Sequence, residues 1–286
     1  MYEPVSRILH FLLLTIFIGA VGSSVYYIKA DSPIRPEVTF LSTSVPGARP
    51  TANPIPEPGW TLLQPGLEKR VFEIHDNQNQ HVESLHIWRL DQRYFRLDVA
   101  YEAIPKSLAR WQEETNALLV ANGGYYSIDN ERYFPDGLTI VNGAARGRSF
   151  GGSAGMLAIH DRGADIRWLA QRPYQPSEPL QAALQSFPVL VEPGGVLGFG
   201  PERESYASAR RTVIAQDRSG RILFLVAPQG HFTLHQLSVY LTESDLDLDI
   251  ALNLDGGGST GILMADPQEI IPSTRPLPFV ILVYPR

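Results

Sequence analysis

The segment LNLDGGGST, residues 252–260, joins an apolar run to one carboxylate and three consecutive glycines. The run IALNL, residues 250–254, predicts a buried strand that leads into Asp255, which places this side chain at the rim of a sheet, where clefts form. Glycines allow positive φ and a close approach of the backbone to a ligand, and successive N–H groups in such a turn can bind an anion. The segment is therefore either a tight turn or a ligand site built from backbone and carboxylate.

Two other segments supply groups that suit the same kind of ligand. ANGGYYS, residues 121–127, ends an apolar run at Asn122 and continues into two glycines and two tyrosines, whose flat faces with a polar tip suit sugar rings. RRT, residues 210–212, opens a predicted strand with arginines, whose permanent charge and forked geometry suit phosphate or carboxylate. The competing interpretations are a glycine turn with core aromatics and a surface salt bridge.

Outward from these segments, the chain consists of short runs that predict β-strands. Polar turns separate alternating or apolar runs, which is the pattern of strands joined by hairpins. The clearest hairpin is ARRTVIAQDRSGRILFLVA, with Asp217 to Gly220 as its turn. The other predicted strand segments are VFEIHD, HVESLHIWRL, YFRLDVAY, LLVAN, GLTIVNGAA, GMLAIHDRGADIRWLA, IALNL and PFVILVYP.

Two helices are predicted between the strands. A helix is predicted over 104–118, because its spacing puts five side chains on one face: Ile104, Leu108, Trp111, Thr115 and Leu118. A second helix over 233–244 begins with a capping box formed by Thr233 and Gln236. The segment AALQSFPVLVEPGG is assigned as the end of a helix or the start of a strand. We therefore predict an α+β fold, a single domain over 60–286 with a mixed, largely antiparallel sheet and a few helices.

The N-terminal residues 1–30 predict membrane targeting. The run ILHFLLLTIFIGAVGSSVYYI carries no charge and, at about 1.5 Å per residue, is long enough to span a bilayer core. It is interpreted as an uncleaved signal anchor or a cleaved signal peptide, and the weak cleavage pattern favours the anchor; a buried core helix is the third interpretation. The Pro-rich residues 31–59 predict a spacer. We expect a bacterial protein anchored in the inner membrane and facing the periplasm or cell exterior, or secreted if the segment is cleaved.

Composition and missing motifs exclude several functions. The formal net charge of -6, with no basic block in the folded part, argues against a nucleic acid partner. The absence of cysteine excludes disulfides, thiolate metal sites and a cysteine nucleophile. The glycine segments lack the Walker lysine, no GxSxG or HExxH occurs, and the acidic run after residue 244 lacks the glycine and glutamate of an EF-hand.

The order of the motifs is more specific than any one of them. NGGYYS, QSFPVLVEPG, RRTVIAQD, TLHQLSVYLTES and ALNLDGGGST occur in this order. Together they resemble the phosphodiester glycosidase domain family, which includes the lysosomal uncovering enzyme and a bacterial branch associated with exopolysaccharides. The resemblance covers roughly residues 85–286, and Phe187 stands where the family more often has glycine before the proline.

The resemblance implies an extracytoplasmic hydrolase that cleaves the C1–O bond of a sugar-1-phosphodiester, with a sugar like N-acetylglucosamine and an envelope glycan or exopolysaccharide as substrate. In that reaction Arg211 is expected to hold the phosphate, and Asp255 to orient water, act as a base or bind a cation. The other positions expected to contact the substrate are Asn122, Gly123, Gly124, Tyr125, Ser127, Thr212, Gly256, Gly257, Gly258, Ser259 and Thr260.

Three assignments stay open at this point. Glycoside hydrolysis usually needs a second carboxylate, and the candidates are Glu192, Asp129 and Asp136. A divalent cation beside the phosphate is possible, with no metal ligands assigned and no other cofactor expected. The alternative function is a non-catalytic module that binds glycans within an envelope or exopolysaccharide assembly system.

Overall fold

The computed structural model describes residues 59–286. The predicted membrane segment 1–30 and all but the last residue of the predicted linker lie outside this part of the chain. Within residues 59–286, no helix combines the length and hydropathy needed to cross a membrane.

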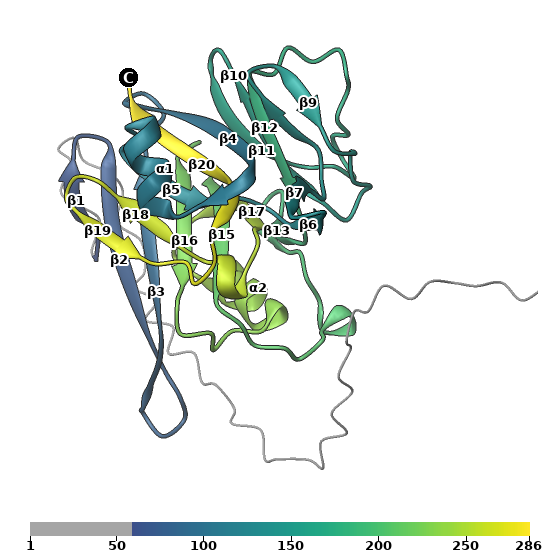
Figure 1. The fold of residues 1–286 in the computed structure, drawn as a ribbon. Helices are drawn as coiled ribbons and strands as arrows, with labels where there is room; N and C mark the ends of the chain where they lie inside the picture. The colour runs from purple at the N-terminus through teal and green to yellow at the C-terminus, as the bar shows by residue number, and fades with distance from the viewer. Residues whose placement is uncertain (1–58) are drawn as a thin grey trace, which may run out of the picture. The chain divides into compact units, whose positions relative to one another are not determined.

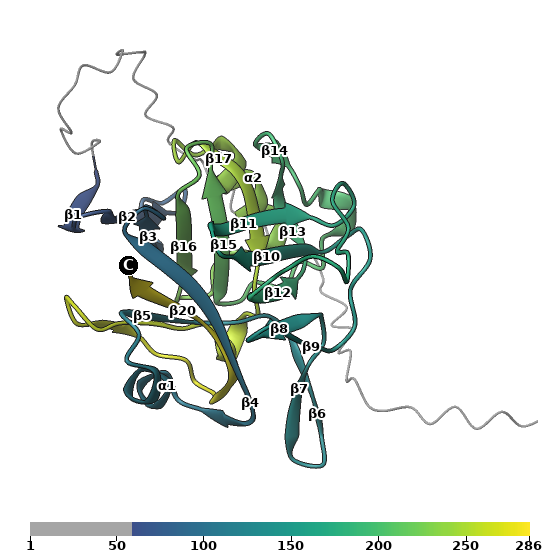
Figure 2. The ribbon, with the colours of Figure 1, turned by 90° about the horizontal axis from the view of Figure 1, so that it is seen from above.

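The largest sheet has eight strands in the order β1-β2-β3-β16-β15-β17-β13-β14 (Figures 1 and 2). Its strands pair antiparallel throughout, and the predicted hairpin is the pair β15–β16. The strand bounds, in sheet order, are Thr61–Gln64, Leu67–His75, His81–Leu90, Ile222–Ala227, Arg211–Asp217, Leu248–Asn253, Val189–Glu192 and Val196–Leu197.

Two five-stranded sheets and a small hairpin complete the strands of the described region. One sheet has the order β11-β10-β12-β8-β9, with bounds Gly163–Trp168, Gly155–His160, Ala182–Ser186, Thr139–Val141 and Ala144–Arg146. The other has the order β19-β18-β5-β20-β4, with bounds Glu269–Ile271, Ile262–Met264, Leu119–Asn122, Leu277–Pro285 and Phe95–Lys106. The hairpin of β6, Tyr126–Asp129, and β7, Arg132–Pro135, projects from the sheets in Figure 2.

The main core lies where the three large sheets meet. Alternate side chains of β16 point to opposite faces of its sheet, so Phe224 enters this central core and Leu225 enters a second one. The second core lies under α2, Leu234–Glu243, whose Leu237 and Leu241 are fully or almost fully buried. Both faces of the eight-stranded sheet are thus covered, which is why β16 is apolar along its whole length.

The α+β prediction is confirmed, with two helices among the strands of residues 59–286. The mixed sheet is resolved into separate sheets, and each strand pairing in this part of the chain is antiparallel. The predicted capping box at Thr233 is also confirmed, with both of its hydrogen bonds present.

One local prediction differs from the structure, and one open assignment is decided by it. The first helix, α1, spans Leu108–Thr115 instead of 104–118, because Ser107 caps its start and Asn116 ends it in the left-handed conformation. Ile104 belongs to β4 and is 72% exposed, so it does not continue the helical face. For the segment AALQSFPVLVEPGG, the start of a strand is confirmed and the end of a helix is wrong, since the segment contains β12 and β13.

Candidate functional site

The predicted segments converge at one end of the central strands. Asp255 follows β17, Asn122 ends β5 and Arg211 begins β15. The Asp255 amide donates to the carbonyl of Gly123 at 3.1 Å, and the Asn122 side chain donates to the Asp255 carbonyl at 2.8 Å. These hydrogen bonds join the sheet that contains β17 to the sheet that contains β5, directly beside the Asp255 carboxylate.

Asn122 is the polar centre of this junction. Its side chain is fully buried and donates to the carbonyls of Gly123 and Asp255, at 3.1 and 2.8 Å. Its oxygen accepts from the Thr212 hydroxyl at 2.7 Å and from the Gly261 amide at 3.1 Å. Asn122 and Thr212 were predicted to contact the substrate. In the structure they hydrogen-bond to each other, and groups of the protein itself occupy the hydrogen-bonding positions of the Asn122 amide.

Substitution of Asn122 by alanine should destabilise the fold. The change leaves a buried hydroxyl, an amide and a carbonyl without partners, and we expect a loss of about 3 kcal/mol or more in the free energy of unfolding. Urea denaturation of the wild type and Asn122→Ala measures this loss. Gln171→Ala, at an exposed position after β11, removes an amide from the surface as the control and should change the stability by less than about 0.5 kcal/mol. Equal stability of Asn122→Ala and the wild type would contradict the assigned role.

The Asp255 carboxylate is half-buried, and its pKa is shifted by burial and by neighbouring groups. Burial raises its pKa above the usual aspartate value, and the negative charge of Asp136 raises it further. A hydrogen bond with the Ser259 side chain, the Gly256 amide at 2.9 Å and the charge of Arg275 act in the opposite direction. A carboxylate whose pKa is perturbed by burial and by specific charges is typical of catalytic sites.

Arg211 is a buried cation held by neutral groups. Its side chain is part of a residue that is 8% exposed, and it donates to the carbonyls of Phe232 at 3.2 Å and Ala207 at 2.7 Å. Burial lowers its pKa, and the charge of Glu204 acts in the opposite direction. Among residues 59–286 no salt bridge joins Arg211 to a carboxylate. A buried guanidinium without a carboxylate partner is suited to bind an anion from outside the protein.

Tyr125 links the acidic and basic groups. Burial raises the pKa of its hydroxyl to about 12, the charge of Asp255 raises it, and the charge of Arg211 lowers it. Its hydroxyl accepts a hydrogen bond from the Asn253 side chain at 2.8 Å. The ring stacks on Phe187 at a centroid distance of 4.5 Å, and Phe187 is 38% exposed. The site therefore combines a carboxylate, a guanidinium and an aromatic wall.

The glycine segment forms a tight turn as well as part of the site. Its amides are partly used: Gly256 donates to the Asp255 carboxylate, Gly257 to the Arg210 carbonyl and Ser259 to the Gly256 carbonyl. The phosphate cradle predicted from Gly256 to Thr260 is therefore smaller than expected, because the backbone bends back on itself. Gly257 has φ +56° and open space at its Cβ position, so this glycine is required by the turn and not by packing.

The other predicted residues divide into three groups. Ser259 and Thr260 are buried, and Ser259 contacts both Asp255 and the Tyr126 hydroxyl. Gly123 and Gly124 are needed for close packing, because an added Cβ would lie 2.4 Å from Phe279 or 2.9 Å from the Gln185 carbonyl. Ser127 is exposed on β6, and no contact joins it to Asp255.

Among the three candidates for a second carboxylate, Asp136 is the one whose charge acts on Asp255. Asp129 lies exposed at the tip of the β6–β7 hairpin. Glu192 is the last residue of β13. Val189, at the start of the same strand, is the residue that pairs with Leu252 of β17. Within residues 59–286, no group of three or more acidic or histidine side chains is arranged to hold a metal ion.

Arg275 is a site residue that the sequence patterns did not indicate. Its charge lowers the pKa of Asp255, and its amide donates to the Gly258 carbonyl at 3.1 Å. Its side chain lies so close to Gly258 that an added Cβ would be 3.0 Å from it. The loop after β19 brings it there, and an isolated arginine before a strand gives no signal of this position.

Comparisons with solved structures place the fold. The catalytic domain of zebrafish N-acetylglucosamine-1-phosphodiester alpha-N-acetylglucosaminidase, auto-inhibited by its pro-peptide, has a TM-score of 0.62 and 18% identity, over 78% of this chain and 85% of that one. A hypothetical protein from Synechocystis has a TM-score of 0.58 and 12% identity, over 78% and 62% of the two chains. An exported protein described as putative, from Burkholderia pseudomallei, has a TM-score of 0.53 and 13% identity, over 71% and 74%.

The family match covers the site. No curated protein matches the chain. Residues 115–284, more than half of the 286-residue chain, match the family model for phosphodiester glycosidases. This span includes the asparagine junction, Arg211, the glycine segment and Arg275. The resemblance seen in the order of the motifs is thereby confirmed, and the chain belongs to the phosphodiester glycosidase family.

Proposed function

We propose that the protein hydrolyses the C1–O bond of a sugar-1-phosphodiester, with a sugar like N-acetylglucosamine. The observation that carries the proposal is the combination of a half-buried carboxylate and a buried, unpaired guanidinium around Tyr125, which interacts electrostatically with both. This pairing suits a substrate that has an anionic leaving group on one side and an electron-poor sugar carbon on the other.

The reaction needs charge stabilisation more than acid catalysis. As the C1–O bond breaks, its electron pair stays on the phosphate oxygen, and Arg211 stabilises that charge. Water adds to C1 while the ionised Asp255 accepts its proton, which leaves a free sugar and a phosphomonoester. The phosphate is already a good leaving group, so protonation of the bridging oxygen contributes less than in ordinary glycoside hydrolysis. Asp255 is therefore assigned as the base, with Ser259 and the Gly256 amide holding its carboxylate.

A direct assay tests this function. The full chain is incubated with N-acetylglucosamine linked through C1 to a phosphodiester, and free sugar and phosphomonoester are quantified with and without EDTA. Release of both products by the wild type supports the proposal, and the EDTA arm determines whether a divalent cation is required. Binding of the substrate without any hydrolysis would contradict it and favour the glycan-binding module.

The pH profile should report the titration of Asp255. Since the base must be ionised, kcat/KM should fall on the acid side with an apparent pKa above the ordinary aspartate value of 3.8. Asp136→Asn removes a charge that raises this pKa, so the acid limb should move to lower pH. Arg275→Gln removes a charge that lowers the pKa, so the limb should move to higher pH.

Asp129→Asn, at the exposed tip of the β6–β7 hairpin, is the matched control for the pH profiles and should leave the acid limb in place. Shifts of the limb in the same direction for Asp136→Asn and Arg275→Gln would show that a group other than Asp255 is responsible for it.

Phe187 should determine how well the substrate binds. Its ring is 38% exposed beside Tyr125 and has a second aromatic neighbour, Phe150, at a centroid distance of 5.2 Å. A sugar or apolar group placed on this ring gains contact area, so Phe187→Ala should raise KM about tenfold with little change in kcat. Steady-state kinetics measures both constants. Phe134→Ala, an exposed aromatic on β7, is the control; an unchanged KM for Phe187→Ala would remove this ring from the binding surface.

We also propose that the reaction takes place outside the cytoplasm, on envelope or exopolysaccharide glycans. The uncharged N-terminal run and the Pro-rich spacer after it support this location. A fusion of a periplasmic reporter enzyme to the C-terminus of the full chain tests it, and reporter activity confined to the cytoplasm would contradict it.

A further inference from the structure

A second cationic region lies at the opposite end of the central strands. It is a cavity of about 770 Å³, within the usual range for small-molecule sites. Four arginines line it, and each comes from a different part of the chain: Arg93, Arg162, Arg221 and Arg286. They follow β3, β10, β15 and the last strand, β20, so tertiary structure alone brings them together.

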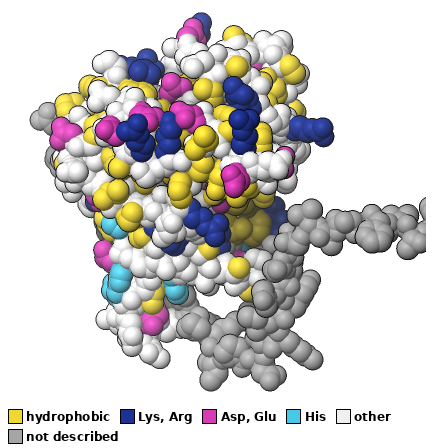
Figure 3. Space-filling model, in the orientation of Figure 1, with side chains coloured by type: hydrophobic (Ala, Val, Ile, Leu, Met, Phe, Trp, Pro, Cys, Tyr) yellow, Lys and Arg dark blue, Asp and Glu magenta, His cyan; other side chains and the backbone are white. Residues whose placement is uncertain are grey.

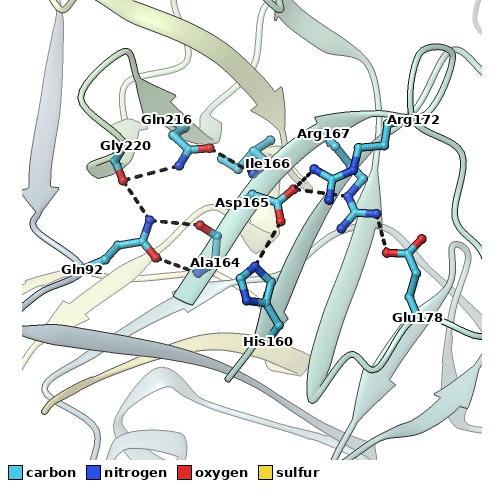
Figure 4. A network of polar contacts seen from close by, with 10 residues as sticks. All are labelled: Gln92, His160, Ala164, Asp165, Ile166, Arg167, Arg172, Glu178, Gln216 and Gly220. Carbon is cyan, nitrogen blue, oxygen red and sulfur yellow. Dashed lines mark hydrogen bonds and ion pairs between the residues drawn. The ribbon is translucent and has the colours of Figure 1, made fainter. Parts of the chain in front are cut away.

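The floor of this cavity is held by Gln92. Its side-chain nitrogen donates to the carbonyls of Ala164 at 2.9 Å and Gly220 at 2.8 Å, and its oxygen accepts from the Ala164 amide at 2.6 Å (Figure 4). Gly163 fits beside it because a Cβ there would lie 2.8 Å from the Gln92 oxygen. One side chain thus fixes the β3–β4, β10–β11 and β15–β16 turns relative to one another, and with them three of the arginines.

The side chains of the lining carry an excess of positive charge. Asp91 is its one acidic side chain, and it pairs with Arg93. Arg221 pairs with the fully buried Asp217, which does not line the cavity. Arg162 and Arg286 have no salt bridge within residues 59–286.

Arg286 is nevertheless fixed in place. Its Nε donates to the carbonyls of Gln92 at 2.8 Å and Phe95 at 3.1 Å, which orients the guanidinium without neutralising it. The lining differs in charge from the chain as a whole, which carries -6. Over the face shown in Figure 3, Lys and Arg side chains are interspersed with Asp and Glu. An arranged group of arginines therefore stands out as a binding feature and not as ordinary solvated surface.

We propose that this cavity is a binding site for phosphate groups, separate from the site around Asp255. The two guanidinium groups without a carboxylate partner, those of Arg162 and Arg286, suit a ligand with more than one phosphate, because each can bind an oxyanion. Arg211 and Asp217 are the two ends of β15, so the two sites lie about 20 Å apart along the strand. A phosphorylated small molecule and a phosphodiester-linked glycan both present phosphate groups, and these groups are what the cavity is proposed to bind.

Calorimetric titration of the full chain with inorganic pyrophosphate tests the site. Arg162→Gln combined with Arg286→Gln should weaken binding at least tenfold, because it removes the two cations that lack a carboxylate partner. Arg110→Gln combined with Arg132→Gln, at exposed positions of α1 and β7, removes the same number of charges and should leave the affinity unchanged. Arg211→Lys is included to separate any pyrophosphate bound at the other site, and it should leave the binding at the cavity in place.

The binding measurements test the phosphate site independently of whether the protein hydrolyses a phosphodiester. Equal pyrophosphate affinity in the double variant and the wild type, with melting temperatures that show both are folded, overturns it. No pyrophosphate binding by the wild type at low ionic strength also overturns it.

Kinetics then identify the source of the phosphate. If the double variant raises KM for a long phosphodiester-linked N-acetylglucosamine polymer but not for the monomeric substrate, the cavity holds the glycan chain; this result rests on the proposed function. If both KM values are unchanged while pyrophosphate binding is weakened, the ligand is a separate phosphorylated molecule.

Discussion

Asp255→Asn should lower turnover of a sugar-1-phosphodiester by about a thousandfold or more, because a positioned base contributes up to about four orders of magnitude to rate. Asparagine has nearly the same shape and still accepts the hydrogen bond from the Gly256 amide, but it cannot take a proton from water. The substitution therefore removes the chemistry and keeps the turn. Rates of product release, measured on the wild type and the variant under saturating substrate, give the ratio.

The same variant should be as stable as the wild type or more stable. The pKa of Asp255 is raised in the folded protein, so between its ordinary and its raised value the folded state binds a proton more tightly than the unfolded chain. Stability conferred by this group then falls as the pH rises through that window. Asparagine avoids the buried charge at neutral pH. A melting temperature well below that of the wild type would show that lost activity reflects lost structure, and full activity in Asp255→Asn would disprove the assigned role.

Arg211→Lys should be the second most damaging change. Lysine keeps the positive charge but lacks the planar fork that can hold two neighbouring carbonyls and still present N–H groups to a phosphate. Loss of one such charge-stabilising contact costs about two to three orders of magnitude in rate. Because the contact strengthens as the bond to phosphate breaks, the loss should appear mainly in kcat, with a smaller change in KM. Steady-state kinetics separates the two.

Arg210→Lys is the matched control for this substitution. Arg210 is the neighbouring residue, and its side chain donates to the Pro272 carbonyl rather than entering the group around Tyr125. It should retain most of the wild-type kcat. If the two lysine variants lose the same amount of activity, the effect belongs to the loop that both arginines support and not to the phosphate.

The sequence predicted the parts of the site that lie in short motifs. Asp255 and the three glycines follow a buried strand, and the structure places them at the end of β17 as expected. Arg211 and Tyr125 come from distant segments, and the charges of both Asp255 and Arg211 act on Tyr125. Local patterns could predict these site residues because each motif combines the end of a strand with one unusual side chain.

The remaining features depend on tertiary contacts that no local pattern contains. Asn122 was expected beside the sugar, yet its amide is saturated by backbone and Thr212 once two sheets come together. The charge of Arg275 acts on Asp255 from a loop that follows the paired strands β18 and β19. The cationic cavity is the clearest case, since its four arginines are isolated in the sequence. The start of α1 was missed for a local reason, because the Ser107 cap outweighs the apolar spacing that begins at Ile104.

The bond that breaks is the most direct test of the account. The full chain is allowed to hydrolyse the phosphodiester-linked N-acetylglucosamine in ¹⁸O-labelled water, and the products are analysed by mass spectrometry. Cleavage at C1–O predicts a free sugar and a phosphomonoester that carries no ¹⁸O, because water attacks carbon. A phosphate product labelled with ¹⁸O, or a sugar-1-phosphate released with the free alcohol, would mean attack at phosphorus and would contradict the roles given to Asp255 and Arg211.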